Sequence, residues 1–237
     1  MTTTTASPDV RPGSTRVPIR VTELLRRAVP QPAPNVCSTL DALWVLYDRV
    51  LRVAPDRVDD PDRDRFLLSK GHGPAGYYAI LAAKGFIPKE WLDDVGGPES
   101  PLGEHPDRIL VPGVEIGSGS LGHGLGLGVG TALGLRAQGL LRPRVYVLLG
   151  DAELDEGSNH EAIAYAGAAG LGNLTAIVID NRSSTHGWPG GAASRFTVNG
   201  WTAASVGGRD HDAIHSALTR GDEHRPHAVV AVIEPGK

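Results

Sequence analysis

The sequence has a single cysteine, Cys37, among its 237 residues. An internal disulfide and a cysteine-rich zinc site are therefore excluded, and a reducing compartment is expected. Basic residues are not in excess, because 23 Lys and Arg stand against 27 Asp and Glu and the formal net charge is −4. This charge argues against binding to a nucleic-acid backbone. No apolar run approaches the ~18 residues of a membrane span, and the N-terminus lacks the basic-then-apolar pattern of a signal peptide. We expect a cytoplasmic protein.

The length is enough for one globular domain with a buried core. Residues 1–16 are polar, rich in Thr and Pro, and without period, and they predict a mobile tail. Residues 17–237 are predicted to form the folded domain. Prolines within residues 31–34 interrupt the chain, and a helix is expected over 38–53 with Ser38 as its N-cap.

Continuous apolar runs mark the strands of this domain. Residues 145–149, 174–179 and 228–233 lack alternation, as strands buried on both faces of a parallel sheet do, and residues 66–68 predict a further short strand. Helices are expected between them, over 158–169 with a capping box at Ser158 and over 210–220 with an Asp cap. This order predicts the α/β class, with a doubly wound, mostly parallel sheet flanked by helices.

Polar side chains follow two of these strands. Asp151 comes directly after Gly150 at the end of the first strand, and Asn181 follows the second strand 30 residues later. Ligands bind outside the carboxyl ends of parallel strands, where these two side chains would converge. Each alone is explained as a helix-capping acid or a turn residue. Together they favour a site for Mg²⁺ or Ca²⁺, since these ions prefer oxygen ligands.

A glycine-rich segment, residues 117–124, runs into a Gly/Ala-rich helix. Backbone N–H groups at a helix start bind phosphate, and glycines allow close approach, so residues 119–122 suit a ligand. The same segment is compatible with a dinucleotide site, although no strong strand precedes it. Farther along the helix, close packing is the expected role of Gly126, Gly128, Gly130 and Gly134.

A metal site and a phosphate loop together resemble the arrangement that holds thiamine diphosphate. Gly150-Asp151 followed by Asn181 resembles the thiamine diphosphate motif, which begins Gly-Asp-Gly and ends in Asn about thirty residues later. The wider chain, roughly residues 38–237, resembles the N-terminal, diphosphate-binding domain of transketolase. The matching stretches are residues 62–73, 105–108, 112–115, 119–124, 156–162, 195–201 and 210–218.

The resemblance implies roles for individual residues. Mg²⁺ or Ca²⁺ would be coordinated by Asp151, Asn181 and the main-chain carbonyl of Ser183. His105 would face the substrate, and Glu156 would lie at a subunit interface that links two active sites by proton relay. His72 would lie near the diphosphate and is also a candidate catalytic residue. The residues around the cofactor would be His72, Gly119, Ser120, Leu121, Gly150, Asp151, Ala152, Asn181, Ser183 and His186.

Three departures from the family pattern stand out. The family's early Gly-His-x-Gly loop falls near residues 31–34, where its histidine is absent, so ordinary sugar-phosphate handling is in doubt. Ala152 replaces a glycine, which requires ordinary backbone dihedrals at that position. His186 stands where the family usually has an acid, and it either changes the charge of the cofactor pocket or is inert.

The resemblance implies one half of a split transketolase, because the family's second domain, which grips the pyrimidine ring, has no counterpart in this sequence. A C-terminal partner subunit would supply it, in a heterotetramer that transfers a two-carbon ketol unit from a ketose. One alternative resembles the first component of 2-oxoacid dehydrogenases, which passes a two-carbon unit from a 2-oxo acid to a lipoyl group or carrier protein. Others are a dinucleotide-binding oxidoreductase and a non-catalytic regulatory subunit.

Overall fold

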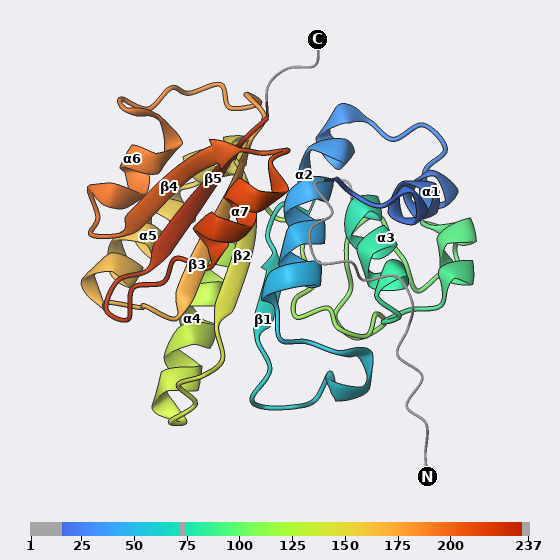
Figure 1. Ribbon diagram of the computed structural model, residues 1–237, viewed down its shortest axis with the longest axis horizontal. Coiled ribbons are helices and arrows are strands. Elements are labelled where there is room, and N and C mark those ends of the chain that lie inside the picture. The colour runs from blue at the N-terminus through green and yellow to red at the C-terminus, as the bar shows by residue number, and fades with distance from the viewer. Residues whose placement is uncertain (1–15, 72–73, 234–237) are drawn as a thin grey trace.

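The computed structural model describes residues 16–71 and 74–233, which build one parallel sheet with helices on both faces (Figure 1). Five strands lie in the order β1-β2-β3-β5-β4, and every pair of neighbours is parallel. The strands are β1 (Arg65–Leu68), β2 (Val145–Gly150), β3 (Leu174–Asp180), β4 (Thr202–Gly207) and β5 (His227–Val232). The predicted doubly wound α/β sheet is therefore confirmed.

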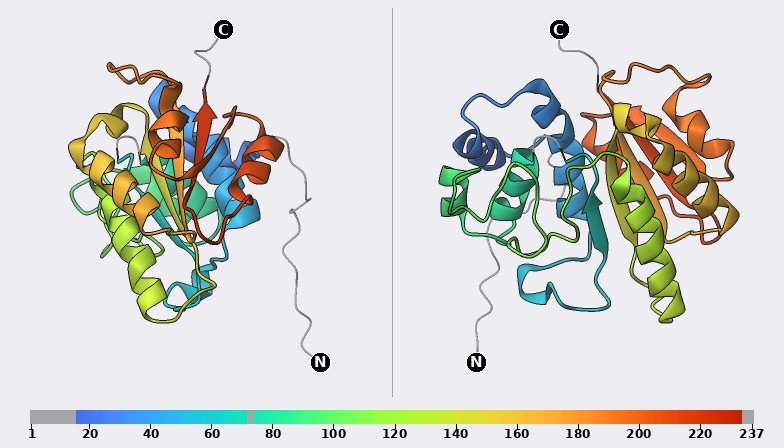
Figure 2. Two further views of the ribbon diagram at one scale, coloured as in Figure 1. Left: turned by 90° about the vertical axis from the view of Figure 1, so that its left-hand side faces the viewer. Right: turned by 180° about the vertical axis from the view of Figure 1, so that it is seen from behind.

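The helices form two layers that enclose the sheet (Figure 2). One layer holds α1 (Ile19–Ala28), α2 (Pro34–Val45), α3 (Ala75–Ala83) and α7 (His211–Leu218). The other holds α4 (His123–Ala137), α5 (Gly157–Ala168) and α6 (Gly191–Thr197). Short helical turns lie at Leu46–Val50, Pro55–Arg57, Lys89–Asp94 and Ala152–Asp155. Alternate strand residues face the two layers: Phe66 and Leu148 pack with the first, and Leu67 and Val147 with the second.

Two helix starts differ from the sequence prediction. Helix α2 begins at Pro34 rather than at Ser38, because proline fits the first helical position, where no N–H is needed. Ser38 is therefore an interior, buried residue and not a cap. Helix α5 begins at Gly157 without a side-chain cap, and the Ser158 hydroxyl donates to the Gly122 carbonyl at 2.9 Å instead. The predicted cap at Asp210 is confirmed, since its carboxylate accepts from the N–H groups of Asp212 and Ala213.

The glycines of α4 do not all serve helix packing as expected. A Cβ at Gly128 would lie 2.4 Å from Val147, so that glycine does let the helix approach β2. At Gly126, Gly130 and Gly134 a Cβ would meet nothing within 4 Å. The prediction is wrong for these three, because they lie on a face of α4 that no described residue covers. Within the described residues, no helix has the length and apolar character needed to cross a membrane.

Strand β4 was not predicted from the sequence, because its residues are small and only partly buried at the edge of the sheet. It pairs with β5 from Thr202 opposite His227 onward. His227 is buried, and its Nδ1 shares a 2.7 Å hydrogen bond with the Thr202 hydroxyl. The sheet thus places an imidazole away from water.

Burial lowers the pKa of His227, and this predicts a pH-dependent stability. The unfolded chain binds a proton at a higher pH than the folded chain, so stability falls as the pH drops below about 6.5. We expect a slope of up to about 1.4 kcal/mol per pH unit from this residue. Urea unfolding at pH 7.5 and 5.5 measures it, and His227→Asn should remove this component. Exposed His224→Asn is the matched control, and an unchanged slope in His227→Asn would contradict the prediction.

Candidate functional site

The carboxyl ends of β2 and β3 bring Asp151 and the following loop of β3 together. Gly150 lies opposite Ile179 in the sheet, and the Asp151 N–H donates to the Ile179 carbonyl at 3.1 Å. The buried Asp151 carboxylate accepts from the N–H groups of Ser183, at 2.7 Å, and Ser184, at 3.1 Å. The Ser183 hydroxyl donates to its other oxygen. The predicted convergence of these two strand ends is thus observed.

Asn181 contributes an acceptor that the protein leaves unused. Its Nδ2 donates to the Ser38 hydroxyl at 3.4 Å, whereas its Oδ1 is buried and has no hydrogen-bond partner among the described residues. A buried acceptor without a partner costs about 1–3 kcal/mol, so such an atom suits a ligand. Carboxylate and amide oxygens are the atoms that Mg²⁺ prefers, and these residues therefore fit a magnesium ion. Clusters of three or more His, Cys, Asp or Glu side chains suited to a metal do not occur in the described part of the chain.

The glycine-rich loop lies at the start of α4, close to this point. Gly122 caps the helix with φ +85° and no side-chain cap. Among the described residues, the N–H groups of Gly119, Ser120 and Leu121 donate no hydrogen bond, and the Ser118 hydroxyl is buried without a partner. Unused donors beside a helix N-terminus form a cradle for an anionic group such as a diphosphate. The loop therefore fits the group that the sequence predicts.

Glu153 organises the site, although sequence analysis did not single it out. Its carboxylate accepts from the N–H groups of Gly122, at 3.0 Å, and Gly150, at 3.2 Å, and from the Ser69 hydroxyl. One acid thus joins the glycine loop, β2 and the segment after β1. Burial raises the pKa of Glu153, and the hydrogen bonds that it accepts oppose the rise. Its place directly after Asp151-Ala152 was the available signal, but its partners lie far away in the sequence.

Lys70 and Ser38 are two further residues that the sequence did not reveal. The buried Lys70 ammonium lies 3.5 Å from the Ser38 hydroxyl, which also accepts from Asn181. Burial lowers the pKa of Lys70, while the nearby charges of Asp151 and Glu153 raise it. Ser38 thus connects α2 to both the strand that carries Asn181 and the segment that carries Lys70.

The other predicted residues lie around this centre. The His105 ring packs on Gly119, since a Cβ there would lie 2.8 Å from His105 Cδ2. Glu156 is exposed before α5, with its Cβ 2.7 Å from where a Gly122 Cβ would be. Exposed His186 accepts from the Ser184 hydroxyl through its carbonyl, at 2.8 Å. Ala152 opens a 3-10 turn with ordinary dihedrals, which satisfies the condition set for an alanine there. His72 lies outside the described residues.

The shape of the glycine loop leads to a matched pair of predictions on α4. Gly122→Ala places a Cβ 2.5 Å from the Ser158 hydroxyl at a positive φ, and we expect a loss of stability of about 1–3 kcal/mol. Gly126→Ala meets open space within the same helix, so alanine should gain up to about 1 kcal/mol. Chemical denaturation of the isolated chain measures both. Equal effects of the two substitutions would contradict this account of the loop.

Comparison with known proteins places the chain. A family model described as transketolase, thiamine diphosphate binding domain, matches residues 32–233. One of the two subunits of an apulose-4-phosphate transketolase from Phocaeicola vulgatus is 35 % identical over 226 residues, which cover 92 % of this chain and 80 % of that protein. A crystal structure of a Pichia stipitis transketolase variant with fructose-6-phosphate superposes with a TM-score of 0.79 and 27 % identity, over 90 % of this chain and 35 % of that one.

A third relative has a different name. Ferredoxin fas2 of Rhodococcoides fascians is 57 % identical over 196 residues, which cover 83 % of this chain and 64 % of that protein. One cysteine cannot supply the four thiolates that usually hold an iron–sulfur cluster, so that name does not carry over to the present chain. The family model covers most of the sequence, and the fold and the strand-end residues agree with it. The chain therefore belongs to the transketolase family and carries its thiamine diphosphate-binding domain.

Proposed function

We propose that this chain is the N-terminal subunit of a split transketolase, which transfers a two-carbon ketol unit together with a C-terminal partner subunit. The observation that carries the proposal is the unpartnered Asn181 Oδ1 at the strand end beside Asp151, next to a glycine loop with unused N–H groups. The name of the P. vulgatus relative, a transketolase subunit, supports a split enzyme. The chain spans only 35 % of the Pichia transketolase, and we assign the second domain to another polypeptide.

In the assembled enzyme, Asp151, Asn181 and the Ser183 carbonyl would hold Mg²⁺, or Ca²⁺ in its place. Bound thiamine diphosphate supplies the carbon nucleophile and electron sink for cleavage of the carbon–carbon bond. His105 would orient the substrate and move a proton at its oxygen atoms, and Glu156 would exchange protons across a subunit interface. The cofactor itself would be enclosed by His72, Gly119, Ser120, Leu121, Gly150, Asp151, Ala152, Asn181, Ser183 and His186.

The domain limits and the assembly are part of the same proposal. We take residues 17–237 as the diphosphate-side domain and residues 1–16 as a tail, of which only Arg16 lies within the described residues. A heterotetramer of two subunits of each kind would form two active sites, each completed by the partner's pyrimidine-binding domain. The single, half-buried Cys37 is compatible with a cytoplasmic enzyme.

Reconstitution with the partner tests the proposal. The chain is purified with a C-terminal transketolase-like subunit, thiamine diphosphate and Mg²⁺, and transfer from a ketose phosphate to an aldose acceptor is measured. We expect activity from the mixture and none from either polypeptide by itself. The missing histidine near residues 31–34 favours a test of a second acceptor, a lipoylated carrier protein with a 2-oxo acid donor. Transfer to that carrier alone, or inactivity of the pair with both acceptors, would overturn the ketol-transfer proposal.

A further inference from the structure

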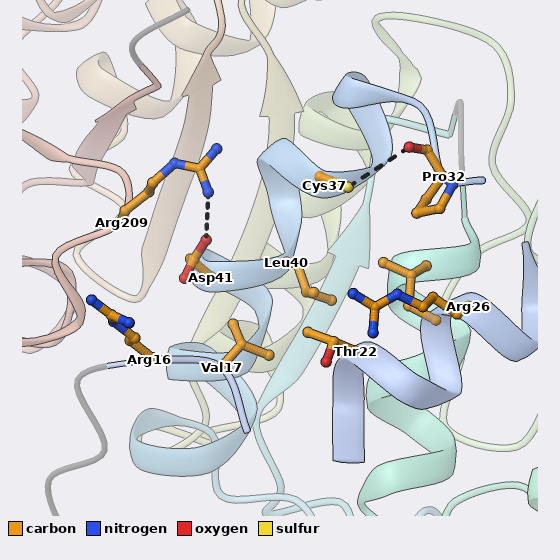
Figure 3. Close-up of a pocket in the computed structure, with 10 residues that line it drawn as sticks. Arg16, Val17, Thr22, Arg26, Pro32, Cys37, Leu40, Asp41 and Arg209 are labelled. Atoms are coloured by element: carbon orange, nitrogen blue, oxygen red, sulfur yellow. Dashed lines mark hydrogen bonds and ion pairs between the residues drawn. The ribbon is translucent and has the colours of Figure 1, made fainter. Parts of the chain in front are cut away.

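A pocket of about 600 Å³ lies on the other side of α2 from Ser38, between α1, α2 and the loop after β4 (Figure 3). Cys37, Leu40 and Asp41 recur at the three- and four-residue spacing of one helix face, and they line this pocket. Arg209 reaches it from the loop after β4. None of these residues has a role in the proposed transketolase site.

The pocket combines an apolar floor with a cationic rim. Leu25 and Leu40 are 3 % and 5 % exposed and form part of the floor with Val17 and Pro32. Three guanidinium groups line the rim, and Figure 3 shows Arg16 and Arg209 on one side and Arg26 on the other. Such a site offers charge to one end of a ligand and apolar contact to the rest of it.

The charge balance of the pocket is positive. Asp41 is its one acidic residue, and the Asp41 carboxylate accepts a 2.8 Å bond from the buried His211 Nε2. Arg209 lies farther from that carboxylate, at 3.9 Å, and its side chain is 66 % exposed. Arg27 is paired with Asp93, whereas the neighbouring Arg26 makes no ion pair with another described residue. Arg26 and Arg209 are therefore able to turn their guanidinium groups toward a ligand.

We propose that this pocket binds a small organic anion, with a carboxylate or phosphate head between the arginines and an apolar body over Leu25 and Leu40. Guanidinium groups bind both heads through paired hydrogen bonds, which makes arginine suited to either. The volume lies within the ~300–1,000 Å³ of small-molecule sites, so an inorganic ion alone would leave it largely unfilled. This site is independent of whether the chain acts in ketol transfer.

Cys37 provides the measurement, because it lines the pocket and is the chain's only cysteine. Alkylation of the full chain by iodoacetamide is followed by mass spectrometry with hexyl phosphate, hexanoate or neutral 1-hexanol present. By mass action, an anion at about ten times its dissociation constant should slow alkylation about tenfold. 1-Hexanol should give no comparable protection at the same concentration. The unfolded chain, which should react equally with every additive, controls for direct effects on the reagent.

Substitutions decide whether the arginines recognise the anion. The double variant Arg26→Ala/Arg209→Ala should lose the protection, and because both side chains are exposed, its folding should be retained and is checked by its unfolding midpoint. Arg220→Ala, between α7 and β5 at the opposite edge of the sheet, should keep the protection. Failure of both anions to protect Cys37, equal protection by 1-hexanol, or unchanged protection in the double variant would each overturn the proposal.

Discussion

Replacing Asp151 with Ala is expected to weaken Mg²⁺-dependent binding of thiamine diphosphate at least about 100-fold, because loss of even an outer-shell metal partner costs 10–100-fold. The substitution removes the carboxylate that would bind the ion. It also releases the Ser183 and Ser184 N–H groups, at 2.7 and 3.1 Å, which shape the loop after Asn181. Calorimetric titration of the reconstituted pair measures binding, and ketol transfer should be lost with it.

Asp222→Ala is the matched control for this substitution. Its carboxylate also holds a loop, through the His224 N–H at 2.9 Å and the Arg225 side chain, but it is remote from the strand ends. Binding and activity should survive there. If Asp151→Ala left the partner's activity unchanged, the chain would be a non-catalytic regulatory subunit. If binding persisted without dependence on Mg²⁺, the metal site would be wrong.

Glu153→Ala should be the most destabilising of the substitutions that we consider, at about 3–5 kcal/mol. It leaves the N–H groups of Gly122 and Gly150 without an acceptor, and each buried unsatisfied group costs about 1–3 kcal/mol. It also leaves a cavity where a buried side chain was. Denaturant unfolding of the isolated chain measures the loss. Exposed Glu23→Ala on α1 is the control, and similar effects of both would contradict a central role for Glu153.

The same residue predicts a pH effect with the opposite sign to that of His227. Burial raises the pKa of Glu153 above the value of the unfolded chain, so the folded chain holds its proton more tightly. Stability from this group is therefore greatest below the unfolded pKa and falls as the pH rises through the raised one. Glu153→Gln, which cannot ionise, should remove this fall while costing less than Glu153→Ala. A fall that persists unchanged in Glu153→Gln would assign the effect to another group.

Several parts of the fold and site were open to prediction because the signals for them are local. Strands β2, β3 and β5 are continuous apolar runs, and such runs are typical of parallel strands covered on both faces. Asp151 and Asn181 follow two of them directly, so the rule that parallel strands end at one edge was enough to bring them together. Strand β4 escaped prediction because an edge strand of small residues carries no such run.

The contacts that shape the site were not predictable in the same way. Ser38 and Asn181 are 143 residues apart, and Ser69 and Glu153 are 84 residues apart. Each of these side chains has an equally good local explanation, and for Ser38 that explanation is a helix cap. Only the packing of α2 against the sheet turns its hydroxyl toward Asn181.

By itself, the sequence determined the layered parallel sheet and the strand ends where an acid and an amide meet, because periodicity and chain order specify both. The tertiary structure alone decided that Asn181 keeps an unused buried oxygen, that Glu153 ties the glycine loop to β2, and that three arginines surround one pocket behind α2. The physical reason is that a hydrogen bond or an ion pair depends on distances of about 3 Å between groups that only the packed elements bring together.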